Sequence, residues 1–513
     1  MYKVLGRIGK ILFHRLGIVA VLILAQLALY FVLLVYLRDN SPLYGWALVA
    51  LSALVVLWIV AGKSNPGYKI GWIIIVLALM PFGSAAYLLL GGNRLSAFNQ
   101  RRLRTMERKI RKNLGSECSR SASLGELMGE DAARMARYLE QTVCCPVYGN
   151  TRTKYYPLGD VCYDDILEAL RGAERYIFIE YFIIEEGKLW NSVLEILKEK
   201  ARQGIEVRVI YDDIGSISTL PSDYPVRLEK LGVHCRVFNR FVPVVSMRQN
   251  NRDHRKYMIV DGRVAFTGGI NMADEYINVK PRFGHWKDSA IRLEGDAVWS
   301  MTVSFLAMWD FTNSEEEHFT PFRPEPAVGG VPGYVQPYHD CPWDNEPVGQ
   351  TVYLNLIYRA QRYVYITTPY LVVDYSLSMA LTTAAKSGVD VRIITPHIPD
   401  KKTVFEMTRS HYEELLEAGV RIFEYEPGFI HAKNFVVDDL WATVGTVNLD
   451  YRSMFLHFEN GVLLYGTPSV EDIRDDFLDT QTRSLPVTLE DCRSISTPHR
   501  LLRDLLRLFA PLL

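Results

Sequence analysis

The sequence has few cysteines, no excess of either charge and no cysteine pattern that would hold a metal. Its 513 residues include seven Cys, and the formal net charge is −1. An odd number of Cys without regular spacing predicts no disulfide framework, and the absence of a Cys-x-x-Cys pair excludes the usual zinc sites. The balanced charge argues against a general polyanion binder, since phosphate neutralisation dominates affinity for nucleic acids.

Long hydrophobic runs are confined to the first 92 residues. Residues 17–37 hold no charge over 21 positions, and residues 44–62 form a second run; each is long enough to cross a bilayer as a helix. A third run, residues 70–90, carries Pro81 and Gly83 at its centre, so we expect it to break there and to re-enter or lie in the interface. Residues 1–92 are therefore predicted to be an α-helical membrane region.

Basic clusters flank this region and predict its orientation. Four Lys and Arg residues precede the first run, and seven follow the third, between positions 101 and 112. Both clusters favour the cytoplasm, which requires an even number of crossings. We expect a multi-pass protein with the rest of the chain in the cytoplasm; the alternative is a third true span that places the rest outside.

Strands and helices alternate from about residue 130 onward, and the pattern occurs twice. Residues 176–184 predict a buried strand, followed by an amphipathic helix that ends at Gly204 and a second strand at 205–213. The same order recurs at 363–371, with a helix that ends at Gly388 and a strand after it. The offset between the copies is 187 residues at the first strand. The chain is therefore predicted to be an α/β protein with an internal duplication.

The predicted domain boundaries follow from these patterns. After the membrane region we expect a basic linker at 93–130, a first lobe at 131–320, a Pro- and Gly-rich linker or lid at 321–346, a second lobe at 347–485 and an amphipathic tail at 486–513. The tail places Leu501, Leu505, Leu508 and Leu512 near one face. That face predicts either a helix docked on the core or one that lies on anionic lipid.

The most specific signal is a pair of matching motifs. Residues 254–271 read HRKYMIVDGRVAFTGGIN, and residues 431–448 read HAKNFVVDDLWATVGTVN. Each copy has His, Lys, Asp, Gly and Asn at the same offsets; the chemically useful members are His254, Lys256, Asp261, Asn271, His431, Lys433, Asp438 and Asn448. Two such copies are very improbable by chance.

The motif's residue types suit chemistry at phosphorus. A His can act as a nucleophile or carry a proton, and a Lys ammonium and an Asn amide bind phosphate oxygens. We expect the His and Lys of each copy to alternate along one strand and to point the same way. Two copies that face each other would let one His attack while the other protonates the leaving oxygen, so no metal is needed. Asp261 and Asp438 either support this set or make turns.

A catalytic His also needs its second nitrogen to be oriented, usually by a carboxylate. Glu459 lies 28 residues after His431, and Asp288 occupies the comparable position in the first half. These two are the candidate orienting acids. His457 has no partner in the repeat and is interpreted as structural.

On these residues the chain resembles the phospholipase D superfamily, whose signature is H-x-K-x4-D-x6-G-x-x-N. Further stretches, YIFIEYFII, GIEVRVIYDDIGS, FTGGINMADEY, TTPYLVVD, GTVNLDYRS and RLFAPLL, are similar to bacterial cardiolipin synthases. The resemblance implies two phospholipase D-type lobes, each a mixed sheet flanked by helices, related by a pseudo-twofold axis. Thr446 stands where the family often has Ser.

The resemblance also implies a reaction. One His attacks phosphatidylglycerol, glycerol leaves, and a second phosphatidylglycerol attacks the phosphatidyl-histidine to give cardiolipin. By family analogy His254 is the nucleophile and His431 the general acid; Lys256, Asn271, Lys433 and Asn448 bind phosphate. The implied partners are anionic phospholipids and the bilayer of a bacterial inner or plasma membrane.

The alternatives are a membrane phospholipase D that releases phosphatidic acid or uses another alcohol, a nuclease of the same superfamily, and a non-enzymatic scaffold. The hydrophobic runs argue against the nuclease, and two intact motifs argue against the scaffold. No cofactor and no nucleic-acid partner are expected, and the oligomeric state does not follow from the sequence.

Overall fold

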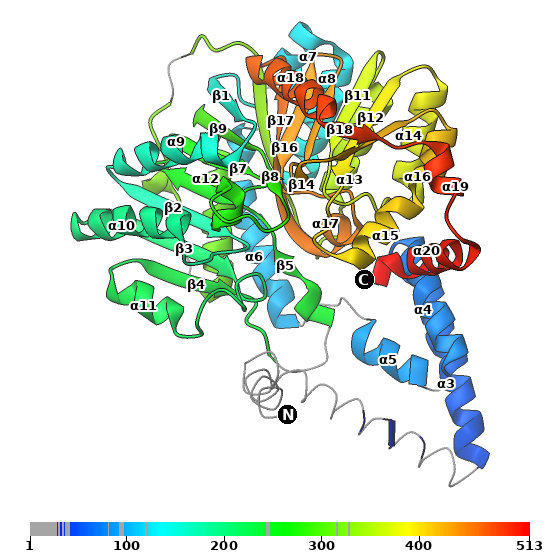
Figure 1. Cartoon of the computed structure of the whole chain (residues 1–513). Helices are drawn as coiled ribbons and strands as arrows, with labels where there is room; N and C mark the ends of the chain where they lie inside the picture. Colours follow the sequence, from blue (N-terminus) through cyan, green and yellow to red (C-terminus); the bar gives the residue numbers. More distant parts are fainter. Residues whose placement is uncertain are drawn as a thin grey trace, which may run out of the picture. The chain divides into compact units, whose positions relative to one another are not determined.

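The computed structural model describes residues 28, 31–32, 35, 42–80, 82–91, 97–117, 121–242, 247–313, 317–326 and 329–512. The chain divides into two compact units by its contacts. The first comprises Met1–Arg94, Asn239–Asn251 and Pro511–Leu513, and the second comprises Leu95–Phe238 and Arg252–Ala510. The second unit, which holds both motifs, is drawn with its labelled sheets in Figure 1.

The N-terminal unit contains three described helices, α3 (Pro42–Ala61), α4 (Pro66–Ala78) and α5 (Phe82–Leu90). The third hydrophobic run therefore forms two helices: α4 ends at Ala78 and α5 begins at Phe82, so the run breaks near its centre as expected. Gly83 is required at this fold-back, because a Cβ there would lie 2.2 Å from the carbonyl oxygen of Ile75. The hydroxyls of Ser52 and Ser84, 2.7 Å apart, join α3 to α5.

Among the residues described, no helix combines the length and the apolar character needed to cross a membrane. The predicted span at 44–62 corresponds to α3, which is not supported as a crossing, and the third run at 70–90 corresponds to α4 with α5. Most of the run at 17–37 lies outside the described residues.

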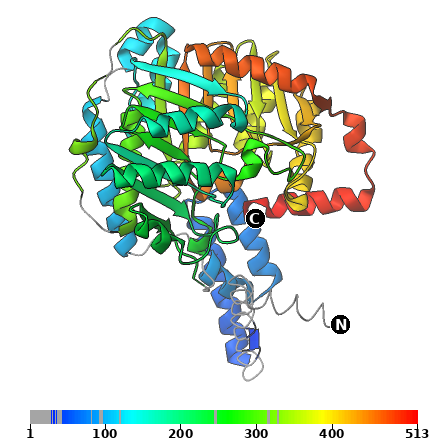
Figure 2. The ribbon, with the colours of Figure 1, turned by 60° about the vertical axis from the view of Figure 1, so that its left-hand side comes forward.

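The first lobe of the second unit is a seven-stranded mixed sheet in the order β1-β9-β7-β6-β2-β3-β4. Strands β2, β3 and β4 are parallel, and the other neighbours are antiparallel. Figure 2 shows the helices of this lobe, in teal and green, against the sheet. Its elements are β1 (Thr151–Tyr156), α9 (Gly159–Arg171), β2 (Tyr176–Tyr181), α10 (Lys188–Arg202), β3 (Glu206–Asp212), α11 (Tyr224–Lys230), β4 (His234–Phe238), β6 (Tyr257–Val260), β7 (Val264–Gly268), η3 (Asp274–Ile277), β9 (Ala290–Gly295) and α12 (Val298–Asn313).

The second lobe repeats this sheet in the order β10-β17-β16-β15-β11-β12-β13-β18. Because the first seven strands match those of the first lobe one for one, the predicted duplication is confirmed. Its elements are β10 (Tyr334–Asp340), α13 (Val348–Arg359), β11 (Tyr363–Thr367), α14 (Tyr375–Lys386), β12 (Asp390–Pro396), α15 (Lys402–Ser410), α16 (Tyr412–Glu417), β13 (Arg421–Tyr425), β15 (Asn434–Val437), β16 (Trp441–Gly445), α17 (Tyr451–Phe455), β17 (His457–Tyr465), α18 (Pro468–Thr482), β18 (Ser484–Pro486), α19 (Leu489–Arg493), α20 (Thr497–Phe509) and η5 (Ala510–Leu512).

Two short strand pairs connect the lobes. β5 (Arg252–Asp253) pairs in parallel with the start of β17, and β8 (His285–Lys287) pairs in parallel with β14 (Gly428–Ile430). Each pair joins the segment immediately before one motif His to the other lobe. The lobes also share a hydrophobic core that includes Phe178, Ile291, Val462 and Phe477.

The observed boundaries differ from the predicted ones. The predicted linker at 321–346 contains β10, which forms the edge of the second sheet, so the second lobe begins before residue 347. The predicted basic linker at 93–130 contains helix α6 (Ala97–Leu114), the 3-10 turn η1 (Gly115–Glu117) and α7 (Ser121–Met128). Together with α8 (Glu130–Val143), α7 contributes to the core of the second lobe, although α8 had been predicted to belong to the first.

Candidate active site

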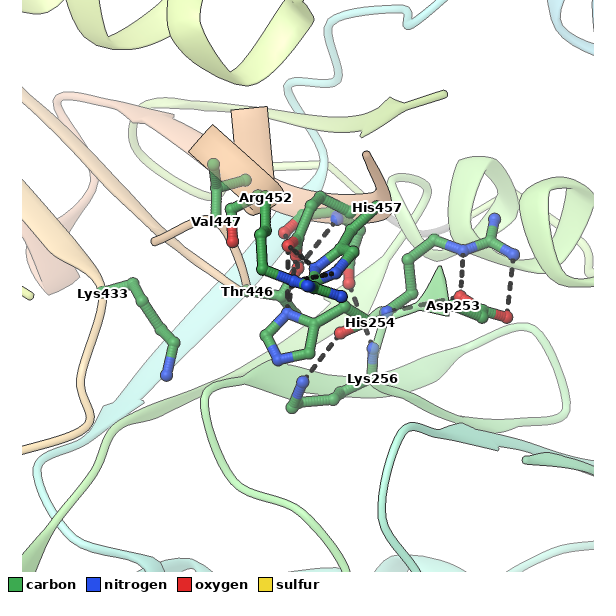
Figure 3. A network of polar contacts seen from close by, with 12 residues as sticks. Asp253, His254, Lys256, Lys433, Thr446, Val447, Arg452 and His457 are labelled. Carbon is green, nitrogen blue, oxygen red and sulfur yellow. Dashed lines mark hydrogen bonds and ion pairs between the residues drawn. The ribbon is translucent and has the colours of Figure 1, made fainter. Parts of the chain in front are cut away.

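His254 lies in the segment between β5 and β6, where its ring is held by a carboxylate from the other lobe. Its Nδ1 is 2.9 and 3.0 Å from the two carboxylate oxygens of Glu459, which is fully buried on β17. The same carboxylate accepts a short hydrogen bond from the Thr446 hydroxyl. Figure 3 shows His254 among these polar contacts, with Lys256 below it and Lys433 to its left. Glu459 therefore fixes the orientation of the His254 ring.

His431 has the equivalent arrangement with the lobes exchanged. Its Nδ1 lies 2.7 Å from a carboxylate oxygen of Asp288, which directly follows β8 of the first lobe. The other Asp288 oxygen accepts a hydrogen bond from the Ser289 backbone N–H at 2.8 Å. Each motif histidine is thus paired with a carboxylate from the opposite half of the chain.

The strand pairs between the lobes explain this exchange. The His254 N–H donates to the Phe458 carbonyl at 2.9 Å, one residue before Glu459. The His431 N–H donates to the Lys287 carbonyl at 2.7 Å, one residue before Asp288. Because the segment before each His pairs with the strand that leads to the opposite acid, backbone register places the two side chains together.

The position of the motif differs from the prediction in one respect. β6 begins at Tyr257 and β15 at Asn434, so the His and Lys residues precede these strands and do not alternate along them. Their placement depends on contacts to the backbone. Lys256 Nζ donates to the carbonyl of His254 at 2.7 Å, and Lys433 Nζ likewise bonds the carbonyl of His431 and lies 2.8 Å from its Nδ1.

Burial and the two ammonium groups control the protonation of the site. Burial, and then the charge of Lys256, hold the pKa of His254 well below its usual value. Burial and Lys433 lower the pKa of His431 to about 4, against the opposing effect of Asp288. Both imidazoles are therefore neutral at pH 7, and a proton on Nδ1 donated to the carboxylate leaves the Nε2 lone pair free to attack.

The two lysines are poised for an anion. Burial lowers the pKa of Lys256 to about 8 and that of Lys433 to about 7. A phosphate oxyanion between them would favour the charged forms and raise these values. The site therefore has the electrostatic character of a receptor for a phosphodiester.

The two motif asparagines are placed differently. Asn271 accepts from the Ile183 N–H at 3.1 Å and donates to the Tyr276 hydroxyl at 2.7 Å, so its amide also fastens the loop after β2. Asn448 is buried, and within the described part of the chain its Oδ1 has no hydrogen-bond partner. Their role as phosphate ligands stays a prediction.

Asp261 and Asp438 lie in turns and hold backbone, which is the second of the two roles that the sequence left open for them. The carboxylate of Asp261 accepts from three successive N–H groups, those of Glu174, Arg175 and Tyr176, each at 2.8 Å. Asp438 does the same for residues 361–363, at 2.7 to 2.9 Å. Both adopt positive φ, 54° and 55°, as turn residues do. With both oxygens occupied at the start of β2 and β11, they have a structural role.

Sequence reasoning missed two side chains in this network. His457, interpreted as structural, has its ring 5.6 Å from that of His254 and its Nδ1 3.6 Å from Glu459. Asn460 accepts from the Lys256 N–H at 3.2 Å and donates to the Thr267 hydroxyl at 2.7 Å. Their proximity in sequence to Glu459 was the available signal, but neither has a counterpart of the same type in the first half.

Donor atoms of His254, His457 and Glu459 lie within 4.8 Å of one another, which is the ligand set of a zinc site. Two observations argue against a cation at this position. The charges of Lys256 and Lys433 act on His254, and the Glu459 carboxylate is already engaged by His254 and Thr446. These three side chains therefore belong to the hydrogen-bond network of the site.

A family model described as "Cardiolipin synthase, PLD-like domain" matches residues 166–280 and 353–480, one segment in each lobe. Fold and site thus define a protein of the phospholipase D-like class. A solved phosphatidylserine synthase from Haemophilus influenzae Rd KW20 shares the fold, with a TM-score of 0.53 and 16% identity over 74% of this chain and 97% of that one.

Curated relatives narrow the class. The cardiolipin synthase of Halalkalibacterium halodurans is 32% identical over 511 residues, which covers 98% of this chain and 100% of the relative. That of Alkalihalophilus pseudofirmus is 32% identical over 513 residues, with the same coverage of each chain. A protein of Streptococcus mutans serotype c is 47% identical over 380 residues, 74% of this chain and 82% of the relative. The chain belongs to the cardiolipin synthase family.

Proposed function

We propose that this chain is a phosphatidyltransferase that converts two molecules of phosphatidylglycerol into cardiolipin and glycerol. The observation that carries the proposal is the pair of crossed contacts, His254 with Glu459 and His431 with Asp288. They give the site two oriented histidines beside two buried ammonium groups, as an in-line exchange at a phosphodiester requires. The relatives named cardiolipin synthase support the choice of substrate.

In the first step, Nε2 of His254 attacks the phosphorus of a phosphatidylglycerol. The phosphorus–oxygen bond to glycerol breaks, and His431 donates a proton to the departing oxygen. His431 must be protonated for this, and the negative charge of the bound phosphodiester favours its charged form. Lys256 and Lys433 stabilise the non-bridging oxygens, and the product is a phosphatidyl group on His254.

In the second step, the glycerol hydroxyl of another phosphatidylglycerol attacks the phosphohistidine. His431, now neutral, accepts the hydroxyl proton, the phosphorus–nitrogen bond breaks, and cardiolipin leaves. His254 returns to its neutral form with Nδ1 directed at Glu459. Throughout the cycle the two carboxylates keep the rings oriented and stabilise their charged forms.

We also place the protein at the bacterial cell membrane, with both lobes on the cytoplasmic side. Support comes from the hydrophobic runs of the first 92 residues and from the basic clusters that flank them. A reporter fused after Leu513 that gives signal only on the outer face would overturn the cytoplasmic placement.

The reaction itself is tested with the purified full chain and phosphatidylglycerol vesicles, without added metal, by mass spectrometry of the lipid products. Cardiolipin with one equivalent of glycerol supports the transfer. Phosphatidic acid as the only lipid product would mean that water reaches the intermediate, and the protein would then be a phospholipase D.

A further inference from the structure

We propose that the exposed leucine face of α20 docks on an anionic phospholipid bilayer beside the active site. The leucine face consists of Leu501, Leu502, Leu505 and Leu508, whose exposed fractions are 69%, 49%, 52% and 38%. Their spacing puts them on one side of the helix. Such a run of large apolar side chains on a surface marks an interaction site rather than ordinary exposure.

The opposite side of α20 is fixed to the second lobe. His499 and Arg503 each contact Glu406 of α15 at 2.8 Å, and Arg507 contacts Glu414 of α16 at 2.6 Å. Leu506 and Ala510 pack in a small apolar cluster with Val372 and Met407. These contacts dock one side of α20 on the second lobe and leave its leucine face pointing away from the lobe.

The leucine face is close to the second motif. The cluster beneath α20 includes Val372, whose N–H donates to the Leu449 carbonyl at 2.8 Å, and Tyr451 of α17. Leu449 directly follows the motif residue Asn448. Figure 1 shows α20 next to α15 and near α17 at this end of the lobe. The leucine face of α20 therefore lies beside the loop of Asn448 and Leu449, which belongs to the His431 half of the site.

A bilayer is the partner that fits this face. Arg500 on α20 and Lys401 and Lys402 at the start of α15 are exposed cations, and an apolar face with cations near it is typical of helices that lie in an anionic interface. The inference rests on the proposed function, which takes its substrates from a bilayer.

The test uses the full-length protein with Leu505→Cys labelled by a dye whose emission shifts to the blue in an apolar environment. Vesicles of phosphatidylglycerol and phosphatidylcholine in equal parts are titrated in. The matched control is Val226→Cys, an exposed apolar position on α11 of the first lobe. Unsubstituted protein labelled in parallel gives the signal of the native thiols, of which Cys235 is half-buried.

The expected result is a lipid-dependent blue shift at position 505, none at 226, and a response weakened about tenfold or more by the added substitution Leu501→Glu. Emission that does not respond to vesicles, or an equal response at both positions, overturns the proposal. A shift that depends on protein concentration without lipid also overturns it and indicates a second copy of the chain. Since the dye needs no turnover, a shift in a protein that makes no cardiolipin separates failure of the proposed function from failure of this surface.

Discussion

Replacement of Glu459 by Gln tests the crossed arrangement of the active site. Glu459 is fully buried, contacts Nδ1 of His254 at 2.9 and 3.0 Å, and belongs to the lobe that does not contain that histidine. Gln has nearly the same size and keeps one carbonyl oxygen as an acceptor. The substitution therefore removes charge from the site with little change in packing.

The expected loss follows from the change in charge at His254. When Nε2 attacks phosphorus, the imidazole becomes positively charged, and in a buried site the Glu459 carboxylate is the group that contacts this charge. Neutralising the carboxylate that orients a catalytic histidine lowers kcat by about 10⁴ in serine proteases. We expect a fall in kcat of about 10³ to 10⁴, equivalent to ~4–5.5 kcal/mol of transition-state stabilisation, with a much smaller change in KM.

The assay measures initial rates of cardiolipin formation by mass spectrometry, with the midpoint of thermal unfolding as a check on folding. Glu424→Gln is the matched control, since Glu424 is also buried in the second lobe but pairs with Arg409 at 2.7 Å, outside the site. A Glu459→Gln variant that folds and keeps more than a tenth of the wild-type kcat would refute the role of this carboxylate.

The other predictions concern the remaining parts of the site. Ala at His254 or His431 abolishes turnover, and acid quench of the wild type traps a phosphatidyl group on His254; a normal rate from either variant contradicts the two-histidine exchange. Asp261→Asn leaves at least one of its backbone donors unpaired, so the free energy of unfolding falls by about 1–3 kcal/mol while kcat of the folded protein, measured at low temperature, stays near wild type. His457→Phe lowers kcat about tenfold, and His457→Asn restores most of it; equal rates for all three proteins would exclude a contribution from His457. Because Lys433 has a pKa of about 7 in the free site and loses its charge above that value, kcat/KM falls between pH 7 and 9, more steeply than kcat, and a flat profile would contradict this.

The sequence predicted the duplication because the fold repeats its local signals. Buried strands such as 176–184 and 363–371 have the same neighbours in both halves, and the sheets assembled from them have the same strand order. The predicted domain boundaries were less accurate, because no local sequence signal shows which lobe a strand or a helix packs into. β10 lies in a Pro- and Gly-rich stretch, and such a composition predicts a linker. Helix α8 packs on the second lobe, which begins about 200 residues later in the sequence.

The candidate site was predicted in its residue types but not in its connections. His254, His431, Asp288 and Glu459 were all identified, because the histidines belong to the repeated motif and each acid follows its motif in a comparable position. Which acid contacts which histidine depends on the pairing of β5 with β17 and of β8 with β14, and no spacing within one copy reveals a strand pair between copies. Asp261 and Asp438 repeat as faithfully as the histidines, but they lie in turns, so repetition alone could not decide between the two roles expected for them.

The crossed carboxylates give a physical reason for the chain to contain two lobes. A single lobe has a motif His but lacks the acid that orients it, since the acid next to each histidine comes from the other sheet. Both histidines, moreover, obtain their position from a backbone hydrogen bond across the same boundary. Separation of the lobes would therefore remove the orientation of both rings together, and the two halves of the reaction depend on one interface rather than on two independent sites.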